Sequence, residues 1–253
     1  MKMKTKLISI GAAAALAIIG VGGAARADAL GPSVTFFQSP IPIVGGVLSD
    51  SSGTPGIPMK DGWTVFDSDG ICSATVQVYY STTGWTTIAT FSGNTSTTKY
   101  VGHYNFTIRP GDYSEPYITS TDCLGNSSQH WDYVQPGLLQ EGSASYSAGW
   151  STSNCTCFSG GATEWSSTAG KTANFVISST RIVGLVSEKA SNRGKVAIYM
   201  DGTLQTTVNL YASTSINRVI VWKSKYLNAS GSHTLTLKVV SGRVDVDALI
   251  TSY

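Results

Sequence analysis

Hydrophobic and polar positions alternate along most of the chain beyond residue 31, in short runs separated by turn residues. Within residues 72–80, Ala74, Val76 and Val78 share one face, and the positions between them are mostly polar. This two-residue period is typical of a strand that buries one face. Because no helical pattern of about ten residues separates the runs, the sequence predicts an all-β chain of β-sandwiches rather than a parallel sheet.

The predicted strands form two groups that meet near residues 135–137. Strands of the first group are predicted at residues 72–80, 85–91, 104–108 and 117–123. Strands of the second are predicted at residues 173–177, 181–186, 194–200, 204–211, 218–222, 233–240 and 243–251. Asp201-Gly202 between two of these is a strong hairpin signal. We therefore expect two sandwich domains, residues 28–138 and 139–253, the second of jelly-roll type.

The first 27 residues have the three parts of a secretory signal peptide. Three lysines within the first six residues precede an apolar run at residues 7–21, and residues 25–27 read A-R-A. We expect cleavage before Asp28 and export of the mature chain, because an A-x-A triplet is typical of the cleavage site. The alternative, a membrane anchor, is disfavoured because no charged stop follows the run. No membrane is expected as a partner after cleavage.

Composition narrows the class of protein. Only 13% of residues are charged and 10% are aromatic, which argues against disorder and against a coiled coil. The signal peptide holds four of the 17 basic residues and no acid, so the mature chain has 13 basic and 15 acidic residues, a net charge of −2. The whole-chain charge of +2 is therefore misleading, and nucleic acid is not expected as a partner.

The charge is divided unequally between the two halves. Residues 28–138 hold three basic and nine acidic residues, a net charge of −6. Residues 139–253 hold ten basic and six acidic residues, a net charge of +4. This asymmetry favours an anionic cell-surface polymer as the partner of the second domain. The alternative is that the two halves attract each other.

Short motifs in the first half occur in a defined order. They are Gly62-Trp63-Thr64-Val65, Asp69-Gly70-Ile71, Trp85-Thr86-Thr87 and Ser120-Thr121-Asp122 followed by Gly125-Asn126. In this order they resemble a bacterial fibronectin type III or immunoglobulin-like (Ig-like) repeat. The resemblance implies a spacer domain.

Motifs in the second half are more specific. They are Tyr146-Ser147 with Trp150, Ser159-Gly160-Gly161-Ala162, Ser167-Thr168-Ala169-Gly170, Arg193-Gly194-Lys195-Val196, Tyr199-Met200-Asp201-Gly202, Val208-Asn209-Leu210-Tyr211, Gly231-Ser232-His233-Thr234-Leu235 and Val244-Asp245-Val246-Asp247-Ala248. Together they resemble a galactose-binding-like β-sandwich, of the kind seen in carbohydrate-binding modules at the C-terminal ends of secreted bacterial proteins. The resemblance implies a non-catalytic glycan-binding domain. In many relatives the strand near Val183 ends in an aromatic residue, whereas this chain reads Gly184-Leu185-Val186.

The four cysteines favour disulfides in an exported chain, and three pairings are open. The Ig-like resemblance places Cys72 and Cys123 near one end of the first sandwich, which favours a Cys72–Cys123 bond. Cys155 and Cys157 would then pair locally as a loop clamp. A redox or metal site at these two residues is the alternative, disfavoured because the C-x-x-C spacing and a nearby histidine are missing.

Asp245 and Asp247 lie two residues apart on one predicted strand, so their carboxylates should face the same side. One interpretation is a structural calcium site completed by Glu141. The favoured interpretation is hydrogen bonding to Arg243, Arg218 or loop amides. We therefore predict no cofactor beyond an optional structural calcium ion.

Catalysis finds little support in the sequence. His103, His130 and His233 lie outside nucleophile and zinc motifs, and no G-x-S-x-G marks a strand-to-helix junction. Two acids on one strand do not form the facing pair of a glycosidase. We expect no enzymatic activity, and a small hydrolase remains as an alternative.

Aromatic residues of the second half are the remaining signal. Flat rings pack against the apolar C–H faces of sugars while nearby polar groups bond the hydroxyls. The candidate rings are Trp150, Trp165, Tyr211, Trp222 and Tyr226, and the candidate polar groups are Asn192, Arg193 and Lys223. The alternative for each ring is a place in the core.

These observations predict a secreted, non-catalytic protein that binds a carbohydrate or a cell-envelope polymer through residues 139–253. The alternative is an extracellular adhesion or structural protein that binds a protein partner. Retention on an insoluble glycan distinguishes the two. The sequence does not fix an oligomeric state.

Overall fold

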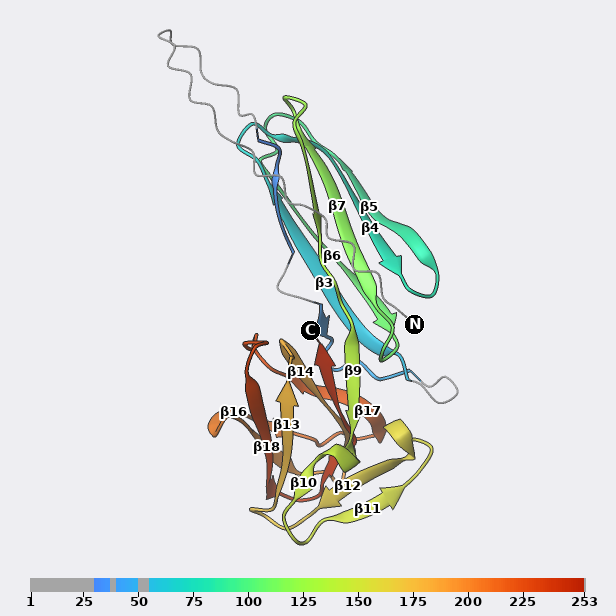
Figure 1. Cartoon of the computed structure of the whole chain (residues 1–253). Helices are drawn as coiled ribbons and strands as arrows, with labels where there is room; N and C mark the ends of the chain where they lie inside the picture. Colours follow the sequence, from blue (N-terminus) through green and yellow to red (C-terminus); the bar gives the residue numbers. More distant parts are fainter. Residues whose placement is uncertain (1–29, 37–39, 50–54, 253) are drawn as a thin grey trace, which may run out of the picture.

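The computed structural model describes residues 30–36, 40–49 and 55–252, so the predicted signal peptide at 1–27 lies outside the described residues. Strands form almost all of the regular structure (Figure 1), and the helical segments of the described ranges are two 3-10 turns, η1 (Glu141–Ser143) and η2 (Ser159–Gly161). Within these ranges no helix is long and apolar enough to cross a membrane. The predicted all-β class with two sandwich domains is confirmed.

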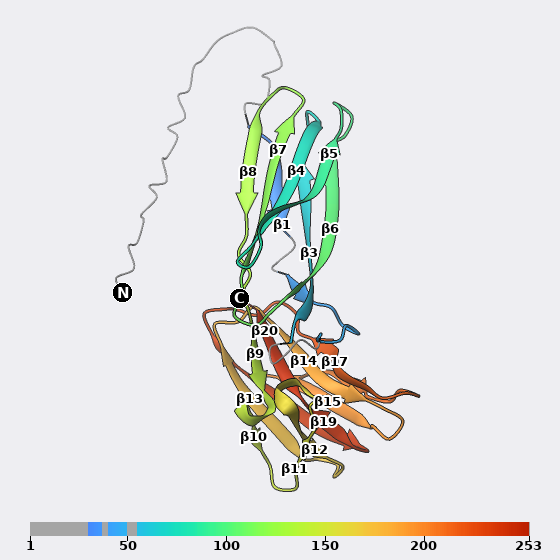
Figure 2. The same ribbon diagram turned by 90° about the vertical axis from the view of Figure 1, so that its right-hand side faces the viewer.

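The first domain consists of two sheets that lie face to face (Figure 2). Its strands are β1 (Ser33–Phe36), β2 (Ile41–Pro42), β3 (Ile57–Phe66), β4 (Ile71–Tyr80), β5 (Gly84–Ser92), β6 (Lys99–Ile108), β7 (Ser114–Asp122) and β8 (Ser127–Trp131). In one sheet, β3 pairs with β6 along one edge and with β1 and then β2 along the other. The other sheet has the antiparallel order β5-β4-β7-β8.

Alternation along these strands places one face of each sheet in a shared core. Val76 and Val78 of β4 are fully buried, as their spacing predicts, and they belong to one cluster with Trp63 and Ile118. Gly102 of β6 lies opposite Trp63, and a Cβ atom at Gly102 would stand 2.2 Å from the indole ring. Only glycine therefore fits beside Trp63.

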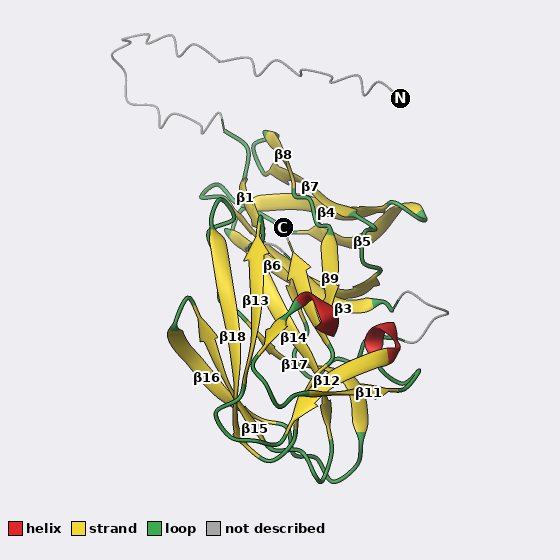
Figure 3. Ribbon diagram, turned by 60° about the horizontal axis from the view of Figure 1, so that its bottom comes forward, coloured by secondary structure: helices red, strands yellow, loops and turns green. Residues whose placement is uncertain are grey.

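The second domain is a sandwich with more strands. They are β9 (Pro136–Gln140), β10 (Ser145–Tyr146), β11 (Ser151–Asn154), β12 (Ala162–Ser166), β13 (Thr172–Ser178), β14 (Ile182–Lys189), β15 (Lys195–Met200), β16 (Thr203–Asn209), β17 (Ile216–Lys223), β18 (Ser232–Ser241), β19 (Val244–Val246) and β20 (Ala248–Ser252). A five-stranded sheet, β10-β13-β18-β15-β16, packs against a four-stranded sheet, β17-β14-β20-β9 (Figure 3). A small third sheet has the order β11-β12-β19.

The hairpin between β15 and β16 follows the sequence signal. Asp201 and Gly202 form its turn with φ values of 50° and 76°. Positive φ at both central residues is the geometry of a type I′ turn, which matches the twist of the flanking strands. The local sequence alone therefore fixes this element.

The four-stranded sheet of the second domain is buried on both faces. Its inner face carries Val183 and Leu185 into the core shared with the five-stranded sheet. Its outer face carries Val186, Ile220 and Ile250 into a second cluster that also contains first-domain residues. β14 is almost completely buried because both of its faces are covered. A strand covered on both faces has a nearly continuous apolar sequence, as in Ile182–Val186.

The first domain reaches this outer face through residues 43–48. Gly45 N–H donates to the Ile220 carbonyl at 2.8 Å, and Leu48 N–H donates to the Arg218 carbonyl at 3.0 Å, so this segment lies along the edge of β17. Pro42 packs over β14, where a Cβ atom at Gly184 would stand 3.2 Å from the proline ring. The position at which the sequence lacks a platform aromatic is thus covered by the first domain.

The structure contains two disulfides. Cys72 and Cys123 join the beginning of β4 to the end of β7, with Cα atoms 4.9 Å apart. Cys155 and Cys157 close the loop between β11 and η2, with Cα atoms 5.0 Å apart. No cysteine in the described part of the chain is free. Disulfides of this kind are typical of proteins that fold in an oxidising compartment.

Candidate functional site

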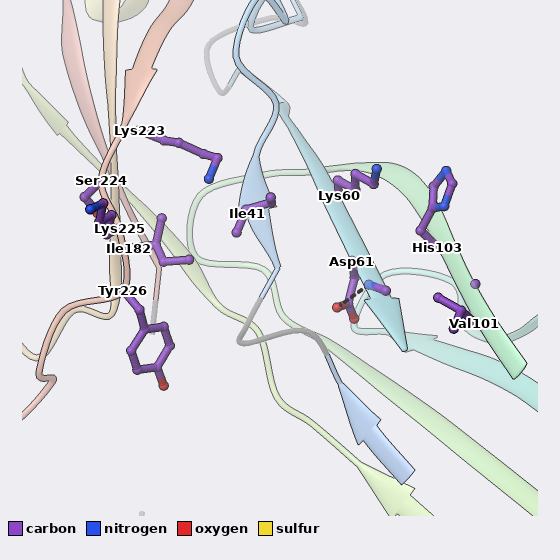
Figure 4. Close-up of a pocket in the computed structure, with 12 residues that line it drawn as sticks. Ile41, Lys60, Asp61, Val101, His103, Ile182, Lys223, Ser224, Lys225 and Tyr226 are labelled. Carbon is purple, nitrogen blue, oxygen red and sulfur yellow. Dashed lines mark hydrogen bonds between the residues drawn. The ribbon is translucent and has the colours of Figure 1, made fainter. Parts of the chain in front are cut away.

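A cleft of about 800 Å³ lies between the two domains (Figure 4), and we call it the interdomain cleft. One wall comes from the first domain and the other from the second. The lining residues are Ile41, Lys60, Asp61, Gly62, Val101, Gly102 and His103 on one side, and Ile182, Lys223, Ser224, Lys225 and Tyr226 on the other. Ligand sites in proteins commonly measure about 300–1,000 Å³, so the cleft has room for one or a few sugar rings.

The first-domain wall is the outer face of β3 and β6. Lys60 and Gly62 alternate with Met59 and Trp63 along β3. Met59 points into the cluster shared by the two domains and Trp63 into the first core, so Lys60 and Gly62 face outward. His103 of β6 lies opposite Gly62 in the register of the two strands. Since Gly62 adds no side chain, the surface beside Lys60 and His103 stays open to the cleft.

The second-domain wall is the end of β17 and the loop after it. Ser224 holds this loop in place, because its N–H donates to the Val183 carbonyl at 2.8 Å and its Oγ accepts the Val183 N–H at 3.0 Å. Tyr226 is 40% exposed. The Arg181 guanidinium lies 5.5 Å from the Tyr226 ring centroid and donates a hydrogen bond to its hydroxyl. The ring is therefore held at the cleft by a cation–π contact.

Three lysines give the cleft a positive charge. Lys60, Lys223 and Lys225 have no ion-pair partner among the described residues. Asp61 is the single carboxylate among the lining residues of the described chain, and burial raises its pKa to about 7. The Gly62 N–H donates to Asp61 Oδ1 at 2.7 Å, which opposes that rise. Near neutral pH, Asp61 carries only part of a negative charge, so the lysines dominate.

The five rings predicted as sugar platforms lie in different places. Tyr226 lines the interdomain cleft, together with the predicted polar group Lys223. Trp150 and Trp222 are half-buried and pack against the core of the second domain. Trp165 is covered by a guanidinium 4.3 Å from its ring centroid, and Tyr211 is exposed outside the cleft lining.

The remaining predicted polar groups form a network inside the second domain. Arg193 is buried and pairs with Glu188 and Asp245, and it also donates to the side chain of Asn192. Arg243 donates to Asp245 at 2.6 Å. Asp245 therefore binds guanidinium groups, in agreement with the favoured interpretation of this residue, and its carboxylate is not open to a metal ion.

Asp247 and Glu141 lie in a different environment. Asp247 Oδ1 accepts the Ser159 N–H at 2.9 Å, whereas Asp247 Oδ2, Glu141 Oε2 and Gln140 Oε1 are buried without a hydrogen-bond partner. Burial, with a smaller contribution from the nearby Glu141, raises the pKa of Asp247 to about 8. The described residues contain no group of three or more His, Cys, Asp or Glu side chains that could hold a metal. Two carboxylates and an amide oxygen nevertheless fit the oxygen preference of calcium, so we keep a structural calcium ion at this point as a prediction.

The cleft also contains residues that the sequence does not predict as site residues. Lys225 could have been predicted from the sequence, because Lys-Ser-Lys at residues 223–225 places two cations beside Tyr226. Lys60 and His103 carry no local signal, since they belong to the other domain and reach the site only through domain packing.

Comparison with known proteins gives weak likenesses. No family model and no curated protein matches this chain. The CBM36-1 domain of a multidomain xylanase from the hindgut metagenome of Trinervitermes trinervoides is similar over 46% of this chain and 96% of that one, with 16% identity and a TM-score of 0.35. A family 35 carbohydrate binding module from Clostridium thermocellum is similar over 46% of this chain and 97% of that one, with 12% identity and a TM-score of 0.37.

A third structure is similar over both domains. The exo-beta-1,3-galactanase from Phanerochaete chrysosporium matches over 88% of this chain and 69% of that one, with 12% identity and a TM-score of 0.35. At these identities and TM-scores, none of the three likenesses carries an argument about ligand or activity. The likeness of the first domain to a fibronectin repeat stays a prediction.

Proposed function

We propose that the mature chain is a secreted, non-catalytic protein that binds an anionic carbohydrate polymer of a cell envelope in the interdomain cleft. The observation that carries the proposal is that Lys60, Lys223 and Lys225, which come from two domains, line the same cleft as the partly exposed ring of Tyr226. The lysines offer charge to carboxylate or phosphate groups, and the ring offers a flat apolar face to a sugar.

The packing of the domains supports a preformed site. Both walls are attached to the buried cluster that contains Leu48, Ile57 and Met59 of the first domain and Ile220 and Ile250 of the second. A rigid contact between the domains reduces the conformational entropy that is lost on binding, because the two walls of the cleft need no rearrangement. The two disulfides and the predicted signal peptide suit an extracellular location.

The test is affinity electrophoresis of the mature chain in gels that contain either polygalacturonate or neutral mannan. We expect retardation by the polyanion alone, weakening as salt rises, because the screening length falls from about 10 Å at 0.1 M to about 3 Å at 1 M. Lys223→Ala combined with Lys225→Ala should weaken retardation roughly fivefold, in keeping with the modest strength of exposed ion pairs.

The matched control is Lys238→Ala, which removes an exposed lysine of β18 outside the cleft lining. It should leave retardation unchanged. Equal retardation by neutral mannan, or an equal loss in the Lys238 variant, would overturn the cleft as an anion site. Binding of a protein partner without any polyanion would establish the adhesion alternative in its place.

A further inference from the structure

A second group of aromatic rings lies on the first domain, on the sheet that does not contribute to the cleft. Trp85, Glu115, Tyr117 and Trp131 line a hollow of about 350 Å³, which we call the aromatic hollow. It lies on the outer face of the β5-β4-β7-β8 sheet, whose inner face packs into the first core. The cleft and the hollow are therefore on opposite sides of the first sandwich.

Strand register places these side chains together. Tyr117 of β7 lies opposite Trp131 of β8, and Tyr79 of β4 lies between Trp85 and Glu115. The Trp85 and Tyr117 ring centroids are 6.0 Å apart at 71°, and those of Tyr79 and Trp85 are 5.5 Å apart at 60°. These edge-on contacts hold the Trp85 ring in a defined orientation.

The two indoles at the rim are open to solvent. Trp85 is 55% exposed and Trp131 is 65% exposed, although tryptophan is normally well buried. Two exposed indoles on the walls of one hollow are unlike scattered surface apolar residues, and such patches mark interaction surfaces. Polar side chains of the same face, Gln77 and Thr87, stand in register with Tyr117 and can bond hydroxyl groups.

The negative charge around the hollow favours a cationic ligand. Glu115 lines it and has no ion-pair partner among the described residues, and no lining residue is basic. The surrounding domain is acidic, with a net charge of −6 over residues 28–138. Aromatic faces beside a carboxylate attract a cation that also carries apolar C–H surface, because cation–π and ionic attraction add together.

We propose that the aromatic hollow is a second binding site, and that it takes a protonated amino sugar of a glycan chain. The sugar ring stacks on Trp131 or Trp85, and its ammonium group pairs with Glu115. Its hydroxyl groups form hydrogen bonds with Gln77 and Thr87 on the same face. The first domain is then a binding domain in its own right, with a charge preference opposite to that of the interdomain cleft.

The test is isothermal titration of the full mature chain with a glucosamine hexamer, whose amines are free, and with the N-acetylated hexamer, whose charge is removed. We expect the charged hexamer to bind at least about tenfold more tightly, at a pH at which its amines are protonated. Trp131→Ala should weaken binding of the charged hexamer roughly tenfold. Glu115→Gln should weaken it roughly threefold and reduce its salt dependence.

Two controls separate the hollow from other surfaces. Phe66→Ala removes an aromatic residue of the other sheet that is 52% exposed, and it should leave affinity unchanged. Lys223→Ala combined with Lys225→Ala should also leave it unchanged, so failure at the cleft and failure at the hollow are distinguishable. Equal affinity for the two hexamers, absence of binding, or full affinity in the Trp131 variant would overturn the proposal.

Discussion

Replacing Leu48 by Ala should loosen the joint between the two domains. Leu48 is fully buried in the cluster that spans both domains, and its N–H donates to the Arg218 carbonyl of β17 at 3.0 Å. Truncation removes apolar atoms from this cluster and leaves a cavity, at a cost of about 2.7–5 kcal/mol for buried leucines. We expect the free energy of unfolding to fall by about 3 kcal/mol, which corresponds to about 6–12 °C in Tm for a chain of this size.

The assay is urea denaturation followed by both tryptophan fluorescence and far-ultraviolet circular dichroism, with calorimetry of the same samples. In the parent chain the shared cluster should couple the domains into a single transition. In Leu48→Ala the first domain loses part of that support, so the fluorescence and dichroism transitions should separate. Retardation by polygalacturonate should weaken as well, because the cleft needs both walls.

Val47 provides the matched control in the same segment. Its side chain is 43% exposed and faces away from the cluster, so Val47→Ala should change stability by no more than about 0.5 kcal/mol. A loss below about 1 kcal/mol in Leu48→Ala, or equal losses in the two variants, would refute the reasoning that residues 43–48 hold the domains together.

Replacing Cys72 and Cys123 by Ala opens a crosslink with a sequence separation of 51, and chain entropy predicts a loss of about 4 kcal/mol in urea denaturation. Gly102→Ala puts a Cβ atom 2.2 Å from the Trp63 ring and should cost roughly 2–3 kcal/mol in the same assay. Burial raises the pKa of Asp61 from 3.8 to about 7, so the folded state holds a proton that the unfolded state releases between these values. Stability should therefore fall as the pH rises from about 4 to about 7, and Asp61→Asn should reduce this slope in thermal melts. Millimolar calcium should raise the Tm of the mature chain, and Asp247→Asn should abolish the rise; no effect of calcium on the parent chain would show that these buried carboxyls are neutral instead.

The sequence by itself predicted β4–β7, β13–β18 and several of their connections, whereas β1–β3 and β8–β12 were not predicted. Alternation along residues 72–80 predicts β4 to within one residue, and Asp201-Gly202 predicts the β15–β16 turn. These features depend on neighbours in the sequence, because the two-residue period of side chains and the φ values of a short turn are local properties. The difference in net charge between the two halves likewise follows from the sequence alone.

Only the tertiary structure decided where the candidate sites lie. Lys223 and Tyr226, which the sequence predicts as binding residues, line the cleft. Arg193, predicted as a polar group of the same site, forms buried ion pairs instead. The rings predicted as sugar platforms all lie in the second half, whereas two of the most exposed indoles, Trp85 and Trp131, belong to the first. An aromatic residue looks the same in sequence whether it fills a core or lines a hollow. The difference depends on which face of a strand another sheet covers, and that is decided by contacts between residues far apart in the chain.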